Sequence, residues 1–168
     1  EWFTNNGGAF ISLAFQKYSY SVVKKLPKNS DKKYHVQWRI KEATNDLNNI
    51  KQPIVRESLR FYKFFENLEF IYFADLPARS GMGSSSAFTV GLLNALHAYG
   101  SKSVSSQQLV QESIYVEQVL VRENVGSQDQ VSAGHGGFNV IRFLPGGEIE
   151  VEPLPISSAR VDSMTNKL

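Results

Sequence analysis

The chain has 168 residues, and its 18 Lys and Arg against 16 Asp and Glu give a formal net charge of +2, which suits one domain or most of one. Because the charges are so nearly balanced, the sequence shows no basic surface for binding nucleic acid. No apolar run is long enough to span a membrane. We therefore expect neither nucleic acid nor a membrane as a partner. The absence of cysteine excludes a disulfide scaffold and a thiolate metal site. Together with the lack of a recognisable signal peptide, it leads us to expect a cytoplasmic protein.

The amino-terminal half is predicted to contain mainly strands. Residues 1–6 are typical of the end of a helix that Gly7 and Gly8 terminate, because glycine adopts a left-handed conformation there without steric cost. Pro53 is predicted to begin a helix with an apolar stripe that extends to Phe65, after a loop at 43–52. Alternation and aromatic content predict strands over residues 9–23, 34–40 and 68–77, the last apolar on both faces and therefore covered on both.

The carboxy-terminal half is predicted to hold two helices and a hairpin. The first helix spans residues 84–99, and the second spans 106–123 after a capping box formed by Ser105 and Gln108. Residues 138–144 and 148–154 are predicted to form the two arms of the hairpin. Helices and strands are therefore interleaved, but not as a strict series of βαβ units.

A glycine–serine turn at residues 76–87 lies between a predicted buried strand and a predicted buried helix. Gly81 and Gly83 allow positive φ angles and a close approach of the backbone to a ligand. The unpaired amides at a helix start attract phosphate, and serine hydroxyls there add donors or a ligand for Mg²⁺. Three serines occupy that start: Ser84, Ser85 and Ser86. An ordinary helix start with flexible glycines and self-capping serines is the alternative, and this motif alone leaves both open.

One carboxylate interrupts an apolar helix face in the segment 106–123. The face comprises Val110, Ile114, Glu117 and Val121. A buried carboxylate needs a partner, which for Glu117 is either a divalent metal or a cation such as Arg122, the commoner case. The three histidines His35, His97 and His135 form no pair with metal-ligand spacing, and we assign them no site role.

A glycine-rich segment, residues 124–137, is predicted to be a loop that wraps around a ligand, with Asp129 and Gln130 at its middle. Asp129 in that position accepts a proton from a hydroxyl or holds the hydroxyl in line for attack on a phosphoryl group. The commoner alternative is an aspartate that satisfies its own turn. Phosphoryl transfer needs a site that binds the phosphates, a metal ligand and a group that positions the nucleophile. The glycine–serine turn, Glu117 and Asp129 are, in that order, of the types that these three roles require.

These motifs resemble those of a known family. The segment LPARSGMGSSSAFTVGLLNALHAY resembles the second signature motif of the GHMP small-molecule kinases. The segment VGSQDQVSAGHGG is similar to the Gly-x-x-Asp-Gln loop of the sugar kinases within that family. The strongest resemblance inside the family is to the D-glycero-D-manno-heptose 7-phosphate kinases, and it extends through KQPIVRESLRFY to EVEPL.

The resemblance implies a fold and a set of site residues. The fold is the α+β amino-terminal domain of ribosomal protein S5 domain 2 type, a mixed sheet with packed helices and a left-handed crossover. Ser85 and Glu117 hold Mg²⁺, and Asp129 lies beside the sugar hydroxyl as base or electrostatic positioner. The ATP phosphate loop comprises Gly81, Gly83, Ser84, Ser85 and Ser86.

The implied activity is that of an ATP- and Mg²⁺-dependent kinase that phosphorylates a sugar or sugar phosphate, namely the anomeric hydroxyl of D-glycero-D-manno-heptose 7-phosphate. A galactokinase-like hexose kinase and a nucleotide-binding fragment without turnover are the alternatives. We expect residues 1–168 to form the ATP-binding amino-terminal domain. Its first strand and motif would precede Glu1, and the third motif and carboxy-terminal domain would follow Leu168.

Overall fold

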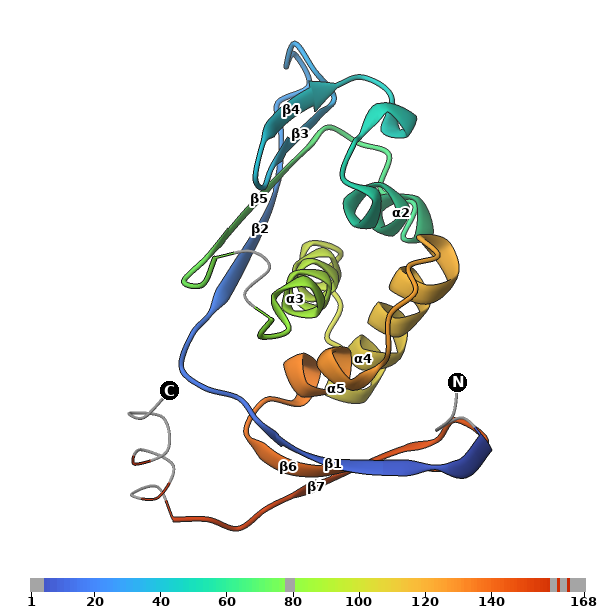
Figure 1. The fold of residues 1–168 in the computed structure, drawn as a ribbon. Coiled ribbons are helices and arrows are strands. Elements are labelled where there is room, and N and C mark those ends of the chain that lie inside the picture. Colours follow the sequence, from blue (N-terminus) through green and yellow to red (C-terminus); the bar gives the residue numbers. More distant parts are fainter. Residues whose placement is uncertain (1–4, 78–80, 158–159, 161–162, 164–168) are drawn as a thin grey trace. The chain divides into compact units, whose positions relative to one another are not determined.

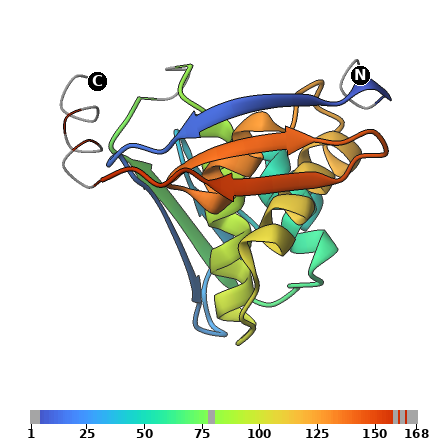
Figure 2. The ribbon, with the colours of Figure 1, turned by 90° about the horizontal axis from the view of Figure 1, so that it is seen from below.

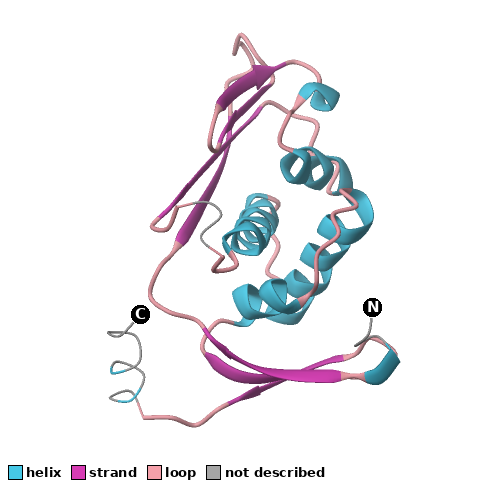
Figure 3. Cartoon of the chain, viewed as in Figure 1, coloured by secondary structure: helices cyan, strands magenta, loops and turns pink. Residues whose placement is uncertain are grey.

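The computed structural model describes residues 5–77 and 81–157, with the single positions 160 and 163. The chain divides into two compact units, one of residues 17–134 and one of residues 1–16 with 135–168. None of the described helices is long and apolar enough to cross a membrane. The α+β fold class implied by the resemblance is confirmed, since both units contain sheet and the larger one also contains several helices (Figure 3).

The smaller unit is an antiparallel sheet with the strand order β1-β6-β7 (Figure 2). It consists of β1 (Gly8–Leu13), β6 (Phe138–Phe143) and β7 (Ile149–Pro153). The hairpin of β6 and β7 confirms the prediction, and Gly146 and Gly147 turn it with φ angles of 99° and 92°. Asn5 and Asn6 are helical, and Gly7 ends that turn with a φ of 74°, as expected from the sequence.

The larger unit contains a mixed sheet with the order β2-β5-β3-β4. Its strands are β2 (Ser19–Lys25), β3 (Tyr34–Gln37), β4 (Lys41–Thr44) and β5 (Leu68–Ala74). Strand β5 pairs antiparallel with β2 and parallel with β3, whereas β3 and β4 form a hairpin. The connection from β3 to the parallel strand β5 passes through β4 and a helix, and its left-handedness stays a prediction.

The predicted single strand over residues 9–23 is wrong. The ladder of β1 ends at Leu13, and the next ladder, that of β2, begins at Ser19 in the other unit. Gln16 and Lys17 between them are exposed and polar, so they interrupt the alternation that keeps one face of a strand buried. A single apolar pattern in the sequence therefore covers two strands that belong to different sheets.

Helices of the larger unit lie along one side of its sheet, with α3 between β2–β5 and the other helices (Figure 1). A methyl group added at Gly91 of α3 would lie 3.2 Å from Ser21 Oγ on β2, so this helix packs tightly on the strand. The helices are α2 (Pro53–Phe61), α3 (Ser84–Tyr99), α4 (Ser106–Tyr115) and α5 (Gln128–His135), with a 3₁₀ turn η1 (Leu47–Asn49) and a π-helical segment η2 (Val116–Leu120).

Strand β5 has one buried face and one partly exposed face, so the prediction of a doubly covered strand is wrong for the described residues. Leu68 and Phe70 are buried on the side of α3. On the other face Phe73 is 52% exposed and stacks on Tyr20 of β2 at 4.7 Å between ring centroids. Cross-strand pairing of aromatic rings thus accounts for the apolar outer face without a second covering layer.

The segment 43–52 is not the predicted loop throughout. After β3 the chain reverses at Trp38, whose amide donates to Ile40 O at 3.1 Å, and Lys41–Thr44 then pairs with β3 as β4. Helix α2 begins at Pro53 as predicted but ends at Phe61. Phe65, which the apolar stripe included, lies beyond the helix and is 50% exposed.

The predicted helix 106–123 begins as expected and ends differently. Ser105 Oγ accepts a hydrogen bond of 3.1 Å from the Gln108 amide at the start of α4, which is one half of the predicted capping box. After Tyr115 the backbone widens into the π-helical η2, which closes where Val121 N donates to Val116 O at 2.9 Å. Such π turns are rare and are found frequently at functional sites.

The segment 124–137 is predicted to be a loop, and the structure corrects this, because residues 128–135 form helix α5. Gly134 packs α5 so closely on α4 that an added methyl group would lie 2.5 Å from Val110 Cγ2. The glycine that suggested a flexible loop instead permits a close contact between two helices.

Candidate functional site

Helix α3 starts at the glycine–serine turn, and the backbone there has the conformation expected from the sequence. Gly81 and Gly83 have φ angles of 75° and 69°. Gly83 is the N-cap of α3 and offers no side-chain acceptor to the first amides of the helix. These amides and the positive end of the helix dipole are therefore suited to bind an anion. Arg79 and Ser80 lie outside the described residues.

The three serines at this start differ in exposure. Ser84 is half-buried and Ser85 is exposed, so both present their hydroxyls at or near the surface. Ser86 is only 5% exposed, which leaves its hydroxyl within the packed interior. Self-capping by a serine at the N-cap does not occur, because the N-cap is a glycine.

Asp129 lies directly beside the turn. A methyl group added at Gly83 would lie 3.5 Å from Asp129 Cγ and 3.7 Å from Asp129 Oδ2. Asp129 is exposed and stands in the first turn of α5, so its carboxylate is accessible to a ligand bound at the turn. A residue with a side chain at Gly83 would fill this space and would also be strained at a φ of 69°. The structure thus brings together two predicted site residues that are far apart in the sequence.

Glu117 is the buried carboxylate that the apolar stripe predicts. It is 1% exposed and lies in η2, where Gln130 Nε2 of α5 donates to its Oε2 at 2.6 Å. Its other oxygen, Oε1, is buried and has no hydrogen-bond partner among the described residues. Neither Arg122 nor another cation forms an ion pair with Glu117 in the part of the chain that the structure describes, so that alternative is not observed.

Burial is the main influence on the acidity of Glu117 and raises its pKa above the ordinary value. The negative charges of Glu123 and Asp129 raise the pKa further, while the nearby Thr89 hydroxyl and the hydrogen bond from Gln130 offset only part of the effect. The carboxylate is therefore held in surroundings that disfavour its charge in the absence of a cation.

Ser85 and Glu117 are connected through one residue. Thr89 Oγ1 donates to Ser85 O at 3.3 Å, one helical turn earlier on α3, and the Thr89 hydroxyl is also close enough to Glu117 to affect its pKa. Ser85 therefore stands on the face of α3 that turns toward Glu117. Their joint binding of a metal stays a prediction.

These residues fit a magnesium ion better than a metal with many protein ligands. No cluster of three or more His, Cys, Asp or Glu that could hold a metal occurs among residues 5–77 and 81–157. Mg²⁺ is commonly held by one or two carboxylates, waters and the phosphates of the substrate. Glu117 Oε1, which is buried without a hydrogen-bond partner among the described residues, is a ligand atom of this type.

Sequence analysis identified Asp129 and Glu117 but assigned no role to Gln130 or Thr89, which link them to the rest of the site. A signal for Gln130 existed: read as a helix, residues 128–135 place Gln130 and Val131 inward and Asp129 outward, as their burial shows. Thr89 gave no signal, because a hydroxyl in the middle of a helix commonly bonds to the preceding turn.

The fold and the site can now be compared with known proteins. The chain matches the GHMP kinases N terminal domain over residues 48–137, which is more than half of its length and includes α3, η2 and α5. The chain belongs to the GHMP kinases. The glycine–serine turn, Glu117 and Asp129 all lie within the matched part of this GHMP kinase.

Two heptose phosphate kinases are similar to this chain, one in sequence and one in fold. The D-glycero-α-D-manno-heptose 7-phosphate kinase of Campylobacter jejuni is 29% identical over 86 residues, which are 51% of this chain and 25% of that protein. The crystal structure of a D-glycero-D-manno-heptose 1-phosphate kinase from Bacteriodes thetaiotaomicron is similar with a TM-score of 0.85 and 22% identity, over 96% of this chain and 56% of that one.

A Lactococcus lactis galactokinase complexed with galactose has a TM-score of 0.63 and 14% identity, over 92% of this chain and 49% of the galactokinase. At such identities the solved structures show a shared fold. The chain therefore spans about half the length of these GHMP kinases.

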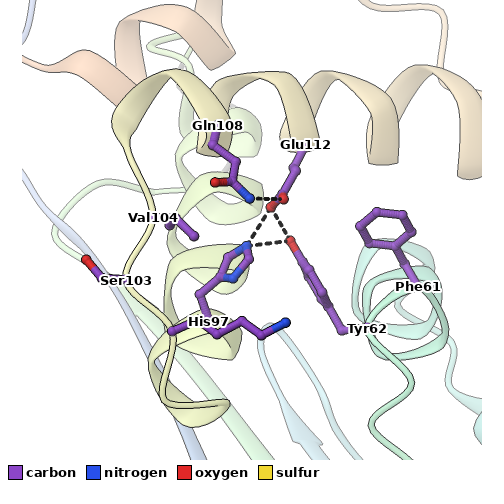
Figure 4. Close-up of a pocket in the computed structure, with 8 residues that line it drawn as sticks. Phe61, Tyr62, His97, Ser103, Val104, Gln108 and Glu112 are labelled. Carbon is purple, nitrogen blue, oxygen red and sulfur yellow. Dashed lines mark hydrogen bonds and ion pairs between the residues drawn. The ribbon is translucent and has the colours of Figure 1, made fainter.

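A second polar cluster occurs in this GHMP kinase, where α2, α3 and α4 meet (Figure 4). His97 Nε2 lies 2.6 Å from Glu112 Oε2, and Tyr62 donates its hydroxyl hydrogen to the same oxygen. Gln108 Nε2 donates to Glu112 Oε1 at 2.8 Å. His97, to which the sequence assigns no site role, thus helps to join three helices.

Glu112→Gln tests the contribution of this cluster to stability. Burial raises the pKa of Glu112, but hydrogen bonds from His97, Tyr62 and Gln108 outweigh it and hold the pKa below its usual value. The carboxylate therefore stabilises the folded state above the ordinary glutamate pKa, and this stabilisation is lost as the pH falls through the lowered folded value. We expect the variant to lose about 2 kcal/mol of unfolding free energy at pH 7. The difference from the unchanged protein should narrow as the pH falls from 7 to 3.

Urea unfolding at both pH values measures this effect. Glu148→Gln, at an exposed position before β7, is the matched control and should change little at either pH. A loss for Glu112→Gln that is equally large at both pH values would contradict the electrostatic explanation.

Proposed function

We propose that the complete protein carrying this chain is an ATP-dependent kinase. It transfers the γ-phosphoryl group to the anomeric hydroxyl of D-glycero-D-manno-heptose 7-phosphate, and residues 1–168 supply its ATP-binding domain. The proximity of Asp129 to Gly83 carries the proposal, because it puts a carboxylate beside an anion-binding helix start. Membership of the GHMP kinases supports the reaction class.

The phosphate chain of ATP would bind at the start of α3. The backbone amides after Gly83 donate to phosphate oxygens, and the hydroxyls of Ser84 and Ser85 add donors. Gly81 would assist, because an added methyl group there would meet none of the described residues within 4 Å, which leaves the backbone open to a ligand. Ser86 is buried, so it would contribute its amide rather than its hydroxyl.

Glu117 and Ser85 would hold Mg²⁺. When bound, the cation neutralises charge on the phosphate oxygens, which is its usual contribution to phosphoryl transfer. Glu117 offers Oε1 because Gln130 already occupies Oε2. The raised pKa of Glu117 is in keeping with a group that lacks its positively charged partner.

Asp129 would orient the acceptor hydroxyl. It would act either as a base that accepts the hydroxyl proton or as a negative charge that stabilises the positive charge developing on the hydroxyl group. Its position at the first turn of α5, next to Gly83, brings it within reach of a nucleophile that approaches the γ-phosphate. Catalysis would then rest on positioning and charge compensation, which together supply most of the rate in phosphoryl transfer. A cytoplasmic location, where ATP is available, is part of the same proposal.

The choice of acceptor is supported by two relatives that are named as heptose phosphate kinases. Similarity to a galactokinase makes a hexose the alternative acceptor. A coupled assay of ADP release with Mg²⁺·ATP and a panel of hexoses, heptoses and their phosphates tests the proposal. We expect the highest kcat/KM for the heptose 7-phosphate, with product phosphorylated at the anomeric carbon by ³¹P NMR.

Three outcomes would contradict the proposal at different levels. A higher kcat/KM for galactose would contradict the proposed acceptor but not the kinase activity. Nucleotide binding without turnover of any sugar would contradict the kinase activity and indicate a nucleotide-binding protein. Absence of nucleotide binding would remove the assigned role of the glycine–serine turn.

A further inference from the structure

Gln130 occupies a place that packing alone does not explain. Its side chain is 1% exposed, and its Nε2 donates to Glu117 Oε2 at 2.6 Å. The amide oxygen of Gln130 is buried without a hydrogen-bond partner among the described residues. An unpaired buried oxygen costs stability, so this end of the side chain offers no advantage over an apolar group of the same volume.

The hydrogen bond between Gln130 and Glu117 determines which carboxylate oxygen is available. The donor from Gln130 fixes the orientation of the Glu117 carboxylate plane, because turning that plane would break the bond to Oε2. Oε1 is thereby kept as the unpaired oxygen. Groups that hydrogen-bond to a metal ligand in this way fix its orientation and affect metal affinity about 10- to 100-fold.

Gln130 also couples two parts of the proposed site. It follows Asp129 directly in α5, so one helix carries both the carboxylate next to Gly83 and the donor to Glu117. Movement of α5 would therefore alter Asp129 and the orientation of Glu117 together.

We propose that Gln130 is a positioning residue of the magnesium site, which holds Glu117 by Oε2 so that Oε1 is available to Mg²⁺. This inference rests on the proposed function and assigns a residue for which neither the motifs nor the comparisons give a role. Its competitor is a purely structural bond that ties α5 to η2.

Gln130→Met tests the inference, because methionine keeps the length and approximate volume but cannot donate a hydrogen bond. We expect its melting temperature without Mg²⁺ to fall by no more than a few degrees, because Glu117 Oε2 loses its donor while the unpaired oxygen of Gln130 is removed. The Mg²⁺ concentration for half-maximal turnover should rise at least tenfold, while the KM for the sugar stays within threefold. The rise in melting temperature caused by magnesium chloride with a nonhydrolysable ATP analogue should shrink, which gives a readout independent of activity.

Gln128→Met is the matched control, since Gln128 is the same residue type in the same helix but is exposed. It should leave both Mg²⁺ responses unchanged. If Gln130→Met does not fold, Gln130→Asn replaces it, because its amide is one methylene shorter and cannot keep the 2.6 Å contact unless the backbone moves. The double variant separates the two residues. In a protein that already carries Glu117→Gln, Gln130→Met should change the magnesium-induced rise in melting temperature by less than a fifth of the change that it causes in the unchanged protein.

The inference and the proposed function fail in different ways. If the unchanged protein shows no Mg²⁺-dependent turnover of any sugar, the proposed function fails and the inference falls with it. If the unchanged protein is active and Gln130→Met loses melting temperature with an unaltered Mg²⁺ response, the bond is structural and only the inference is overturned.

Discussion

Asp129→Asn is expected to lower kcat about a thousandfold while the affinity for nucleotide changes less than threefold. Asparagine has the same shape, so it preserves the contact with Gly83, where an added methyl group lies 3.5 Å from Asp129 Cγ. It cannot accept the proton of the acceptor hydroxyl, and it lacks the charge that orients this group. Single-turnover phosphoryl transfer, together with calorimetric titration of a nonhydrolysable ATP analogue, measures the two effects separately.

Asp31→Asn is the control for the loss of one negative charge, because the Asp31 side chain is 80% exposed in the segment before β3. It should leave kcat unchanged. Turnover by Asp129→Asn equal to that of the control would remove Asp129 from the mechanism. A large fall in melting temperature would instead indicate that Asp129 serves the structure of α5.

Glu117→Gln is expected to lower Mg²⁺-dependent turnover about a hundredfold or more without loss of stability in the metal-free protein. Burial raises the pKa of Glu117, with added repulsion from Glu123 and Asp129, so the charged form is disfavoured in the folded state. Stability at neutral pH is therefore reduced by this charge, and glutamine, which is neutral, should melt at the same temperature or higher.

Glu123→Gln is the matched control for Glu117, because it removes a neighbouring negative charge that also raises the Glu117 pKa. We expect only a small change in turnover for this variant. The metal assignment would be contradicted if Glu117→Gln lowered the melting temperature by several degrees but left the Mg²⁺ dependence of turnover unchanged. Glu117 would then be a structural acceptor for Gln130.

Much of the larger unit could be predicted because its local signals agree with its packing. Pro53 begins α2, Ser105 caps α4, and Gly83 precedes α3 with a positive φ. Each of these depends on a few neighbouring residues, so the sequence contains the information directly. The hairpin of β6 and β7 was predictable for the same reason.

The errors occur where distant parts of the chain determine the outcome. One apolar pattern at residues 9–23 was divided between two sheets, and Phe73 lies on an open face of β5 that its apolar neighbours suggested was covered. Residues 128–135 form a helix despite Gly134, because packing on Val110 favours a small residue there. Tertiary contacts overrode local preference in each case.

For the candidate site, the sequence indicated which residues carry charge but not what supports them. Glu117 could be recognised because a carboxylate breaks an apolar stripe, and its burial confirms that inference. Its bond to Gln130 could not be recognised, because it depends on the π turn at η2 and on the helical form of α5. Roles of the individual site residues stay predictions.

The contact at Gly134 has a consequence for the opposite end of α5. The backbone of Gly134 and the Val110 side chain approach so closely there that one extra carbon at Gly134, 2.5 Å from Val110 Cγ2, would force α4 or α5 to shift. Asp129 stands at the other end of the same short rigid helix, so it would be displaced from Gly83 as well. The distance between Asp129 and the glycine–serine turn thus depends on the absence of a side chain at Gly134, a position at the far end of α5.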